Sequence, residues 1–183
     1  GTTIDGAVVN GGGLRASIPD GAVTQGDVQG VLPYRNQVCV VTMTGQTLLE
    51  IMEASTAAVP YPAGAFPQVS GIEMTIRTDI PFAKGRAYGN GKYYKSAKPG
   101  QRVTIHRVGG KDFSPDAVYT IATYEFISRG GDAYGVLAEP GRAETKYVGY
   151  TDAEAVVNYI QDELQGRIGT EYAAPQGRIQ LRP

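Results

Sequence analysis

Strand-like and helix-like patterns follow one another irregularly along this sequence, and this order constrains the fold more than any other feature. Alternating or β-branched runs predict strands at residues 7–10, 36–44, 68–78, 102–108, 118–127 and 177–183. Amphipathic runs predict helices at residues 24–32, 44–56 and 151–165. A doubly wound parallel sheet needs a regular strand–helix–strand order, which is missing here. We therefore predict an α+β fold in which residues 1–183 form a single domain with a mixed β-sheet and flanking helices.

The predicted helices have recognisable first turns. Thr24 is followed three residues later by Asp27, and Thr151 is followed in the same way by Glu154. This spacing is typical of a capping box, in which two side chains satisfy the free amides of a helix N-terminus. Thr44 is the expected cap of the helix at residues 44–56.

Composition excludes several classes of protein. The 183 residues carry a net charge of −1, so no strong field favours nucleic acid or a membrane surface as a partner. No run is apolar enough to span a bilayer. Cys39 is the single cysteine and His106 the single histidine, which leaves too few ligands for the usual zinc sites. We expect no cofactor in this chain and an ordinary strand position for His106.

Three consecutive glycines, Gly11 to Gly13, follow the first predicted strand and are themselves followed by Arg15. Bare backbone amides beside an arginine suit an anion. The stretch lacks the Lys-Ser/Thr ending of a P-loop. The residues alone leave two interpretations open, a ligand-binding loop and a tight structural turn.

Two further loops combine aromatic and polar side chains. In "LPYRN", Tyr34 and Asn36 could stack on and hydrogen-bond a base, although a tyrosine in the core is the simpler interpretation. In "YEFISRGGDAY", Phe126 precedes a glycine pair that presents Asp132. That carboxylate could accept hydrogen bonds from two vicinal hydroxyls, or it could satisfy its own backbone in an Asx turn.

A long polar stretch at residues 79–101 contains "GNGK", which predicts a hairpin turn. Basic residues are interleaved with tyrosines from here to residue 102: Lys84, Arg86, Tyr88, Lys92, Tyr93, Tyr94, Lys95, Lys98 and Arg102. Such a mixture can bind an anionic polymer. A solvated hairpin loop is the alternative, and the near-zero net charge favours it.

Four motifs occur in order: "NGGGLR", "LPYRN", "MTG" and "GGDAY". Together they make nearly the whole chain resemble the C-terminal domain of the 5'-nucleotidase, UDP-sugar hydrolase and 2',3'-cyclic-nucleotide phosphodiesterase family. The resemblance implies a two-domain enzyme, in which an N-terminal metallophosphatase domain holds two divalent metal ions and directs a metal-activated water at phosphorus. That domain is expected to be absent from this chain, which alone is expected to have no phosphatase activity.

The resemblance also implies a substrate site. Tyr34 and Phe126 would sandwich the base, and Asp132 would bind the ribose hydroxyls. Tyr34 stands where the family more often has Phe. Ala133 stands where it usually has Gly, so the loop carrying Asp132 is expected to be strained or reshaped if that position needs a positive φ.

Four further residues complete the site that the resemblance implies. Asn10 and Asn36 would be polar contacts near the base. Arg15 would reach toward phosphate, and Gly64 would line the base pocket. The expected partners are an adenosine- or AMP-like nucleoside or nucleotide and the N-terminal domain of the same protein.

The expected function is therefore substrate recognition in a metal-dependent bacterial 5'-nucleotidase that is periplasmic, secreted or attached to the cell wall. One alternative is a surface adhesion module that keeps the fold without binding nucleotide. Another is the substrate domain of an enzyme that acts on a UDP-sugar, a 2',3'-cyclic nucleotide or the ligand of a sulfur-oxidising relative.

Overall fold

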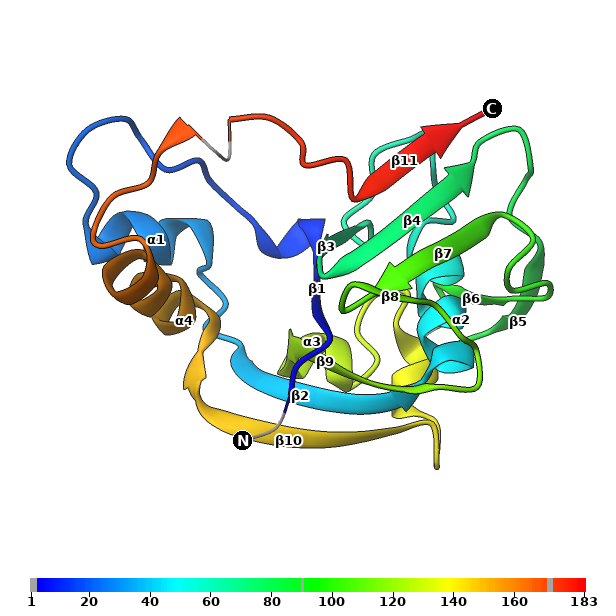
Figure 1. Ribbon diagram of the computed structural model, residues 1–183. Coiled ribbons are helices and arrows are strands. Elements are labelled where there is room, and N and C mark those ends of the chain that lie inside the picture. Colours follow the sequence, from blue (N-terminus) through cyan, green and yellow to red (C-terminus); the bar gives the residue numbers. More distant parts are fainter. Residues whose placement is uncertain (1–2, 90, 171–172) are drawn as a thin grey trace.

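The computed structural model describes residues 3–89, 91–170 and 173–183 (Figure 1). Within these residues the elements, in chain order, are β1 (Gly6–Asn10), η1 (Gly11–Gly13), α1 (Gln25–Val31), β2 (Gln37–Thr44), α2 (Gly45–Ser55), β3 (Pro67–Ser70), β4 (Ile72–Arg77), β5 (Lys84–Ala87), β6 (Tyr94–Ser96), β7 (Val103–Val108), β8 (Lys111–Asp112), β9 (Val118–Tyr124), α3 (Glu125–Ser128), η2 (Gly135–Ala138), β10 (Ala143–Thr151), α4 (Asp152–Asn158), η3 (Tyr159–Glu163) and β11 (Ile179–Arg182).

The described strands form a five-stranded sheet in the order β10-β2-β9-β1-β3, a four-stranded sheet in the order β11-β4-β7-β8, and the hairpin β5-β6. β1 runs parallel to β9 and β11 parallel to β4, whereas the other pairs are antiparallel. The predicted α+β class with mixed strand directions is therefore confirmed.

The main core lies where α2 contacts both larger sheets, through β2 and β7. Leu48 and Met52, on the predicted inner face of this helix, are fully buried, and Leu49 lies at the margin of the core. Thr44 caps the helix by accepting the Thr47 amide, as its sequence predicts. Burial of this apolar stripe holds the two sheets together.

One predicted strand is wrong in extent. Residues 68–78 form two strands, because the chain turns at Gly71, which has a φ of +68°. A Cβ at this position would lie 2.6 Å from the Asp5 carbonyl oxygen, so only glycine fits the turn. β3 therefore joins the five-stranded sheet and β4 the four-stranded sheet. Ile72 and Met74 still face the core, as the alternation predicts.

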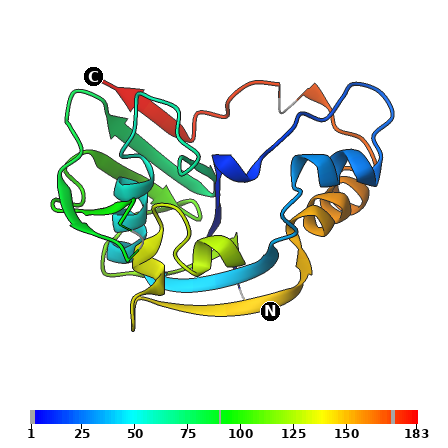
Figure 2. The ribbon, with the colours of Figure 1, turned by 180° about the vertical axis from the view of Figure 1, so that it is seen from behind.

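α1 and α4 lie side by side at the end of the molecule away from β4 and β7 (Figures 1 and 2). Both predicted capping boxes are present, at Thr24 with Asp27 and at Thr151 with Glu154. The helix predicted at residues 151–165 is α-helical only as far as Asn158 and continues as the π-helical turn η3. This pair encloses a small apolar cluster of its own: Val28, Val31, Leu32, Ala153, Val156, Val157 and Ile160.

The strand β10 was not predicted. It pairs with β2 alone at the edge of its sheet, and most of its residues are exposed, so its sequence lacks an alternating apolar pattern. The predicted hairpin is present as β5 and β6, with Asn90 of its turn lying outside the described residues.

Among the described residues, no helix has the length and apolar character needed to cross a membrane.

Candidate functional site

All five strands of the larger sheet end or begin at the same edge, the one formed by strand ends rather than by an outer strand. β1 and β9 are parallel neighbours, so their C-terminal ends lie together. β2 runs antiparallel to β9, and Val38 near its start pairs with Tyr124 at the end of β9. β3 begins here as well, because Pro67 pairs with Asn10 at the end of β1. Loops from distant parts of the sequence therefore meet at this edge.

All seven site residues that the resemblance implies lie in segments that flank this edge. They are Asn10 at the end of β1, Arg15 after η1, Tyr34 and Asn36 before β2, Gly64 before β3, Phe126 in α3, and Asp132 after α3. The strand predicted at residues 118–127 ends at Tyr124, where the chain turns into α3. This turn takes Phe126 out of the sheet.

The three glycines let parts of the protein itself approach closely. The Gly12 amide donates to the Gly64 carbonyl at 2.8 Å, and a Cβ on Gly12 would lie 3.0 Å from the Gly64 Cα. A Cβ on Gly13 would lie only 2.5 Å from the Tyr124 hydroxyl oxygen. The tight-turn interpretation is thus confirmed for this loop, while its role as a ligand loop remains a prediction.

A hydrogen-bonded chain joins this turn to Asp132. The Tyr124 hydroxyl donates to Asn10 Oδ1, and Asn10 Nδ2 donates to Asp132 Oδ2 at 2.7 Å. Burial raises the pKa of Tyr124 to about 12, so this hydroxyl is protonated and acts as the donor at neutral pH. The orientation of the Asn10 amide follows, since its oxygen must accept and its nitrogen must donate. Asn10 is only 5% exposed, so it binds the Asp132 carboxylate from the buried side of the site.

The other carboxylate oxygen is held from a different element. The Tyr93 hydroxyl, just before β6, donates to Asp132 Oδ1 at 3.2 Å. Burial, followed by the charge of Asp132, raises the pKa of Tyr93, which keeps this hydroxyl a donor. Both oxygens of Asp132 are therefore fixed by side chains far away in the sequence. Tyr124 begins the stretch "YEFISRGGDAY" and Tyr93 lies in the basic, tyrosine-rich stretch, but neither was predicted to contact Asp132.

The backbone strain expected at Ala133, which stands where the family usually has Gly, is not observed. The left-handed conformation falls on Asp132 itself, with a φ of +47°, and on Gly130, with a φ of +83°. Ala133 has no positive φ and is buried, so alanine fits there without backbone strain. Asp tolerates the left-handed region better than most residues. The Asp132 side chain bonds to Asn10 and Tyr93 rather than closing an Asx turn.

Gly131 fastens this loop to α3. Its amide donates to the Phe126 carbonyl at 2.8 Å. A Cβ on Gly131 would lie 2.5 Å from that carbonyl oxygen and 2.6 Å from the Phe126 ring. The positions of Phe126 and Asp132 are therefore coupled through a glycine.

The two predicted stacking residues are exposed. Tyr34 is 60% and Phe126 43% exposed, so the interpretation of Tyr34 as a core residue is wrong. Among the described residues, the stacked ring pair is Phe113 with Tyr119, and the rings of Tyr34 and Phe126 do not contact each other. Phe126 lies against Gly131, the neighbour of the fixed Asp132, and an exposed ring in that position favours a ligand site.

Arg15 and Asn36 make local contacts. Arg15 is exposed, and its Nη1 lies 3.4 Å from the Gly12 carbonyl oxygen, a long and weak contact. Asn36 Nδ2 donates to Asp152 Oδ2 at 3.0 Å, and the Asn36 carbonyl accepts the Asp152 amide at 2.9 Å. Asn36 therefore ties the start of β2 to the first turn of α4, and its contact with a base remains a prediction.

The polar stretch that contains the hairpin is less available than its sequence suggests. Arg102 and Tyr88 are buried. Lys95 and Arg86 form ion pairs with Glu139 at 2.6 Å and 3.0 Å. Arg102, Tyr88 and Lys95 therefore serve the protein itself, whereas Lys84, Arg86, Lys92 and Lys98 are exposed.

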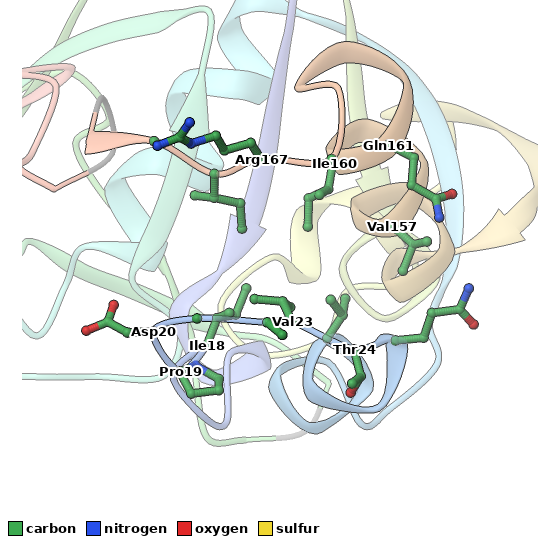
Figure 3. Close-up of a pocket in the computed structure, with 16 residues that line it drawn as sticks. Ile18, Pro19, Asp20, Val23, Thr24, Val157, Ile160, Gln161 and Arg167 are labelled. Atoms are coloured by element: carbon green, nitrogen blue, oxygen red, sulfur yellow. The ribbon is translucent and has the colours of Figure 1, made fainter.

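A cleft of about 740 Å³ lies elsewhere, between residues 18–25 and the segment that includes α4 and η3. Figure 3 shows Ile18 and Val23 on one wall and Val157 and Ile160 on the other. It contains none of the seven predicted site residues. A second hollow of about 550 Å³ is lined by Gly12 and Gly64 among others, and so reaches the glycine contact of the sheet edge.

In the described part of the chain, no group of three or more His, Cys, Asp or Glu side chains is placed to hold a metal ion. The described side chains therefore do not form a site for the two metal ions, which the resemblance assigns to a separate domain. Cys39 is buried, and His106 is exposed on β7 with Nε2 at 2.8 Å from Thr75 Oγ1.

The structure is a domain with mixed sheets, and glycine-rich loops and exposed aromatic rings flank one edge of the larger sheet. This arrangement agrees with the family that the order of the four motifs predicts. The model of the family described as 5'-nucleotidase, C-terminal domain, matches residues 1–139, and the chain belongs to this family. The predicted family membership is confirmed.

The chain is 34% identical over 179 residues to a 5'-nucleotidase of Vibrio cholerae, covering 97% of this chain and 27% of that protein. It is 32% identical over 174 residues to the trifunctional nucleotide phosphoesterase protein YfkN of Bacillus subtilis, covering 88% of this chain and 11% of the relative. The crystal structure of the 5'-nucleotidase precursor from Thermus thermophilus superposes with a TM-score of 0.75 at 29% identity, covering 97% of this chain and 31% of that one. The chain thus spans less than a third of the length of each of these relatives.

Proposed function

We propose that this chain is the substrate-recognition domain of a metal-dependent 5'-nucleotidase-type phosphohydrolase and binds the nucleoside part of an adenosine- or AMP-like substrate. One observation carries the proposal: the Asp132 carboxylate is held by Asn10 and Tyr93 at the sheet edge where the exposed rings of Tyr34 and Phe126 flank the strands.

The chemistry of these groups suits a nucleoside. A base has two π-faces, and stacking on an aromatic side chain contributes about 1–3 kcal/mol per base. A carboxylate offers about four acceptor positions, two of which Asn10 and Tyr93 occupy. The other two can accept the two O–H donors of a ribose diol. Arg15, exposed beside the glycine turn, can swing toward an anionic phosphate.

The reaction itself belongs to the whole protein. Two divalent metal ions on a separate metallophosphatase domain would activate the attacking water, and this chain would orient the substrate. We expect the whole protein to be periplasmic, secreted or attached to the cell wall. The isolated chain should not hydrolyse AMP in the presence of added divalent metal, and sustained phosphate release by the pure chain would refute this.

The binding site is tested by titrating the isolated chain with adenosine and following amide and aromatic NMR shifts. Saturable shifts are expected around Tyr34, Phe126 and Asp132. Phe126→Ala should abolish them, because one stacking face is lost. Val118→Ala is the matched control, since Val118 is 64% exposed at the opposite end of β9. Unchanged spectra at millimolar adenosine would contradict the proposal.

The structure removes part of the basis of the adhesion alternative, because Tyr88 and Arg102 are buried and Lys95 pairs with Glu139. Lys84, Arg86, Lys92 and Lys98 remain exposed. A UDP-sugar differs from AMP in its base and in the groups on its phosphate, and a 2',3'-cyclic nucleotide differs from AMP in the diol. Parallel titrations with uridine and with 2',3'-cyclic AMP separate these candidates, because a cyclic phosphate removes the diol that Asp132 would bind.

A further inference from the structure

The hairpin β5–β6 touches residues 132–139, which comprise the loop that carries Asp132, η2 and Glu139, at three places. The Tyr93 hydroxyl donates to Asp132 Oδ1 at 3.2 Å. The buried ring of Tyr88 packs so closely on Gly135 that a Cβ there would lie 2.5 Å from it. At the base of the hairpin, Lys95 pairs with Glu139 at 2.6 Å. These contacts run along residues 132–139 and fix this segment from one side.

Backbone hydrogen bonds join described residues on the two sides of the hairpin turn. The Tyr88 amide donates to the Tyr93 carbonyl, and the Gly91 amide donates to the Tyr88 carbonyl, both at 2.8 Å. These bonds place Tyr93 at a fixed position relative to the buried Tyr88. Its hydroxyl therefore reaches Asp132 from a braced backbone rather than from a loose loop.

Asp132 has a conformation that needs such support. A non-glycine residue at positive φ is uncommon, and its side chain direction follows from that backbone. Asn10 holds Oδ2 from the sheet, and Tyr93 holds Oδ1 from the hairpin. With either bond lost, the carboxylate could rotate about its Cβ–Cγ bond and misalign its remaining acceptor positions.

We propose that the β5–β6 hairpin is part of the substrate site and that Tyr93 is a positioning residue that orients Asp132 toward a vicinal diol. This inference rests on the proposed function, because it names the substrate feature, the pair of ribose hydroxyls, that the same site selects. The polar stretch at residues 79–101 then gains a role that its basic and aromatic composition does not suggest.

The test compares Tyr93→Phe with Tyr94→Phe in the isolated chain. Tyr94 is the neighbouring tyrosine, with Lys84 Nζ 3.6 Å from its ring centroid, and it has no bond to Asp132. Both variants are titrated with adenosine and with 2',3'-dideoxyadenosine, which lacks both ribose hydroxyls. Tyr93→Phe should weaken adenosine binding by at least about 10-fold, the lower end of what one hydrogen bond to a charged group contributes, and leave dideoxyadenosine binding unchanged. Tyr94→Phe should change neither.

Amide hydrogen exchange gives a second measurement that needs no ligand. The Gly131 amide donates to the Phe126 carbonyl in α3 at 2.8 Å, and the Tyr134 amide donates to the Gly131 carbonyl at 3.1 Å. Tyr93→Phe should raise their exchange rates by about 3- to 10-fold as the loop opens more often, with no change in Tyr94→Phe.

The outcomes separate the two proposals. Wild-type affinity for adenosine in Tyr93→Phe overturns the role of Tyr93 while leaving nucleoside binding intact. Equal weakening of adenosine and dideoxyadenosine also overturns it, because the effect would not pass through the diol. If the unmodified chain binds no adenosine, the proposed function fails in this chain. Unchanged exchange at Gly131 and Tyr134 would then overturn the positioning role as well, and faster exchange would support it.

Discussion

Gly13→Ala tests whether the glycine turn and the Asp132 network form one unit. The new Cβ would lie 2.5 Å from the Tyr124 hydroxyl oxygen, so this oxygen must move by about 0.9 Å to reach the 3.4 Å of ordinary contact. Tyr124 is 3% exposed, and its ring cannot swing away freely. Overpacking of this kind costs about 1–3 kcal/mol, and weakening the buried bond to Asn10 adds about 0.5–1.5 kcal/mol.

We therefore expect Gly13→Ala to lower the free energy of unfolding by about 2–4 kcal/mol. Tyr124→Phe alone leaves the buried Asn10 Oδ1 without its donor and should cost about 1–3 kcal/mol. In the double variant the clashing oxygen is gone, and the nearest atoms to the Cβ are Asn10 Oδ1 at 3.2 Å and the ring carbon at 3.5 Å. The alanine should then cost less than about 1 kcal/mol.

The assay is urea unfolding followed by circular dichroism, since the chain has no tryptophan. The four proteins form a double-mutant cycle with an expected coupling above about 1 kcal/mol. Gly30→Ala is the control, because Gly30 lies in α1 with open space around its Cβ position, and it should be neutral or stabilising. Additive effects of Gly13→Ala and Tyr124→Phe, to within about 0.5 kcal/mol, would refute the reasoning.

Three further predictions follow from single contacts. Gly131→Ala should destabilise the chain by about 1–3 kcal/mol and displace Phe126, seen as weaker adenosine binding, and wild-type binding would contradict it. Arg102→Met should cost about 3–5 kcal/mol in urea unfolding, because the buried guanidinium donates to three backbone carbonyls, and a loss below about 1 kcal/mol would contradict it. The capping bonds lower the pKa of Asp27 and of Glu154 from 3.8 and 4.5. The stability that these ionised carboxylates give to the folded state is therefore complete above these values and is lost as pH falls through the lowered pKa. Amide shifts in the first turns of α1 and α4 should therefore change only below about pH 4, and a transition near about pH 6 would contradict this.

Local sequence signals were sufficient where the chemistry is local. The capping boxes at Thr24 and Thr151 are visible because both partners lie three residues apart. The segments of the candidate site could also be placed, since each follows or precedes a clear strand pattern. By contrast, the break at Gly71 depends on the approach of Asp5, which is distant in the sequence. The edge strand β10 depends on pairing with β2 rather than on its own pattern.

The least predictable part of the site is what holds its central carboxylate. Asp132 stands out in its motif, but the donors that fix it come from β1 and from the hairpin. Asn10 is 122 residues and Tyr93 is 39 residues from Asp132 in the sequence, so no spacing rule could link them to it. The same holds for Tyr124, whose bond to Asn10 spans 114 residues. The parallel register of β1 and β9 brings Asn10 and Tyr124 together, and the hairpin β5–β6 brings Tyr93 to Asp132.

This arrangement explains how the proposed binding site can rest on so many glycines. Ordering glycine is entropically unfavourable, and a loop rich in glycine would ordinarily be mobile. Here the absent side chains let Gly12 pack on Gly64 and let Gly13 lie against Tyr124, so the backbone is held by the protein itself. A substrate that meets an already oriented carboxylate loses less free energy to ordering the site. The rigidity of the Asp132 network is therefore the property that the Gly13 and Tyr93 variants both probe, one from the sheet and one from the hairpin.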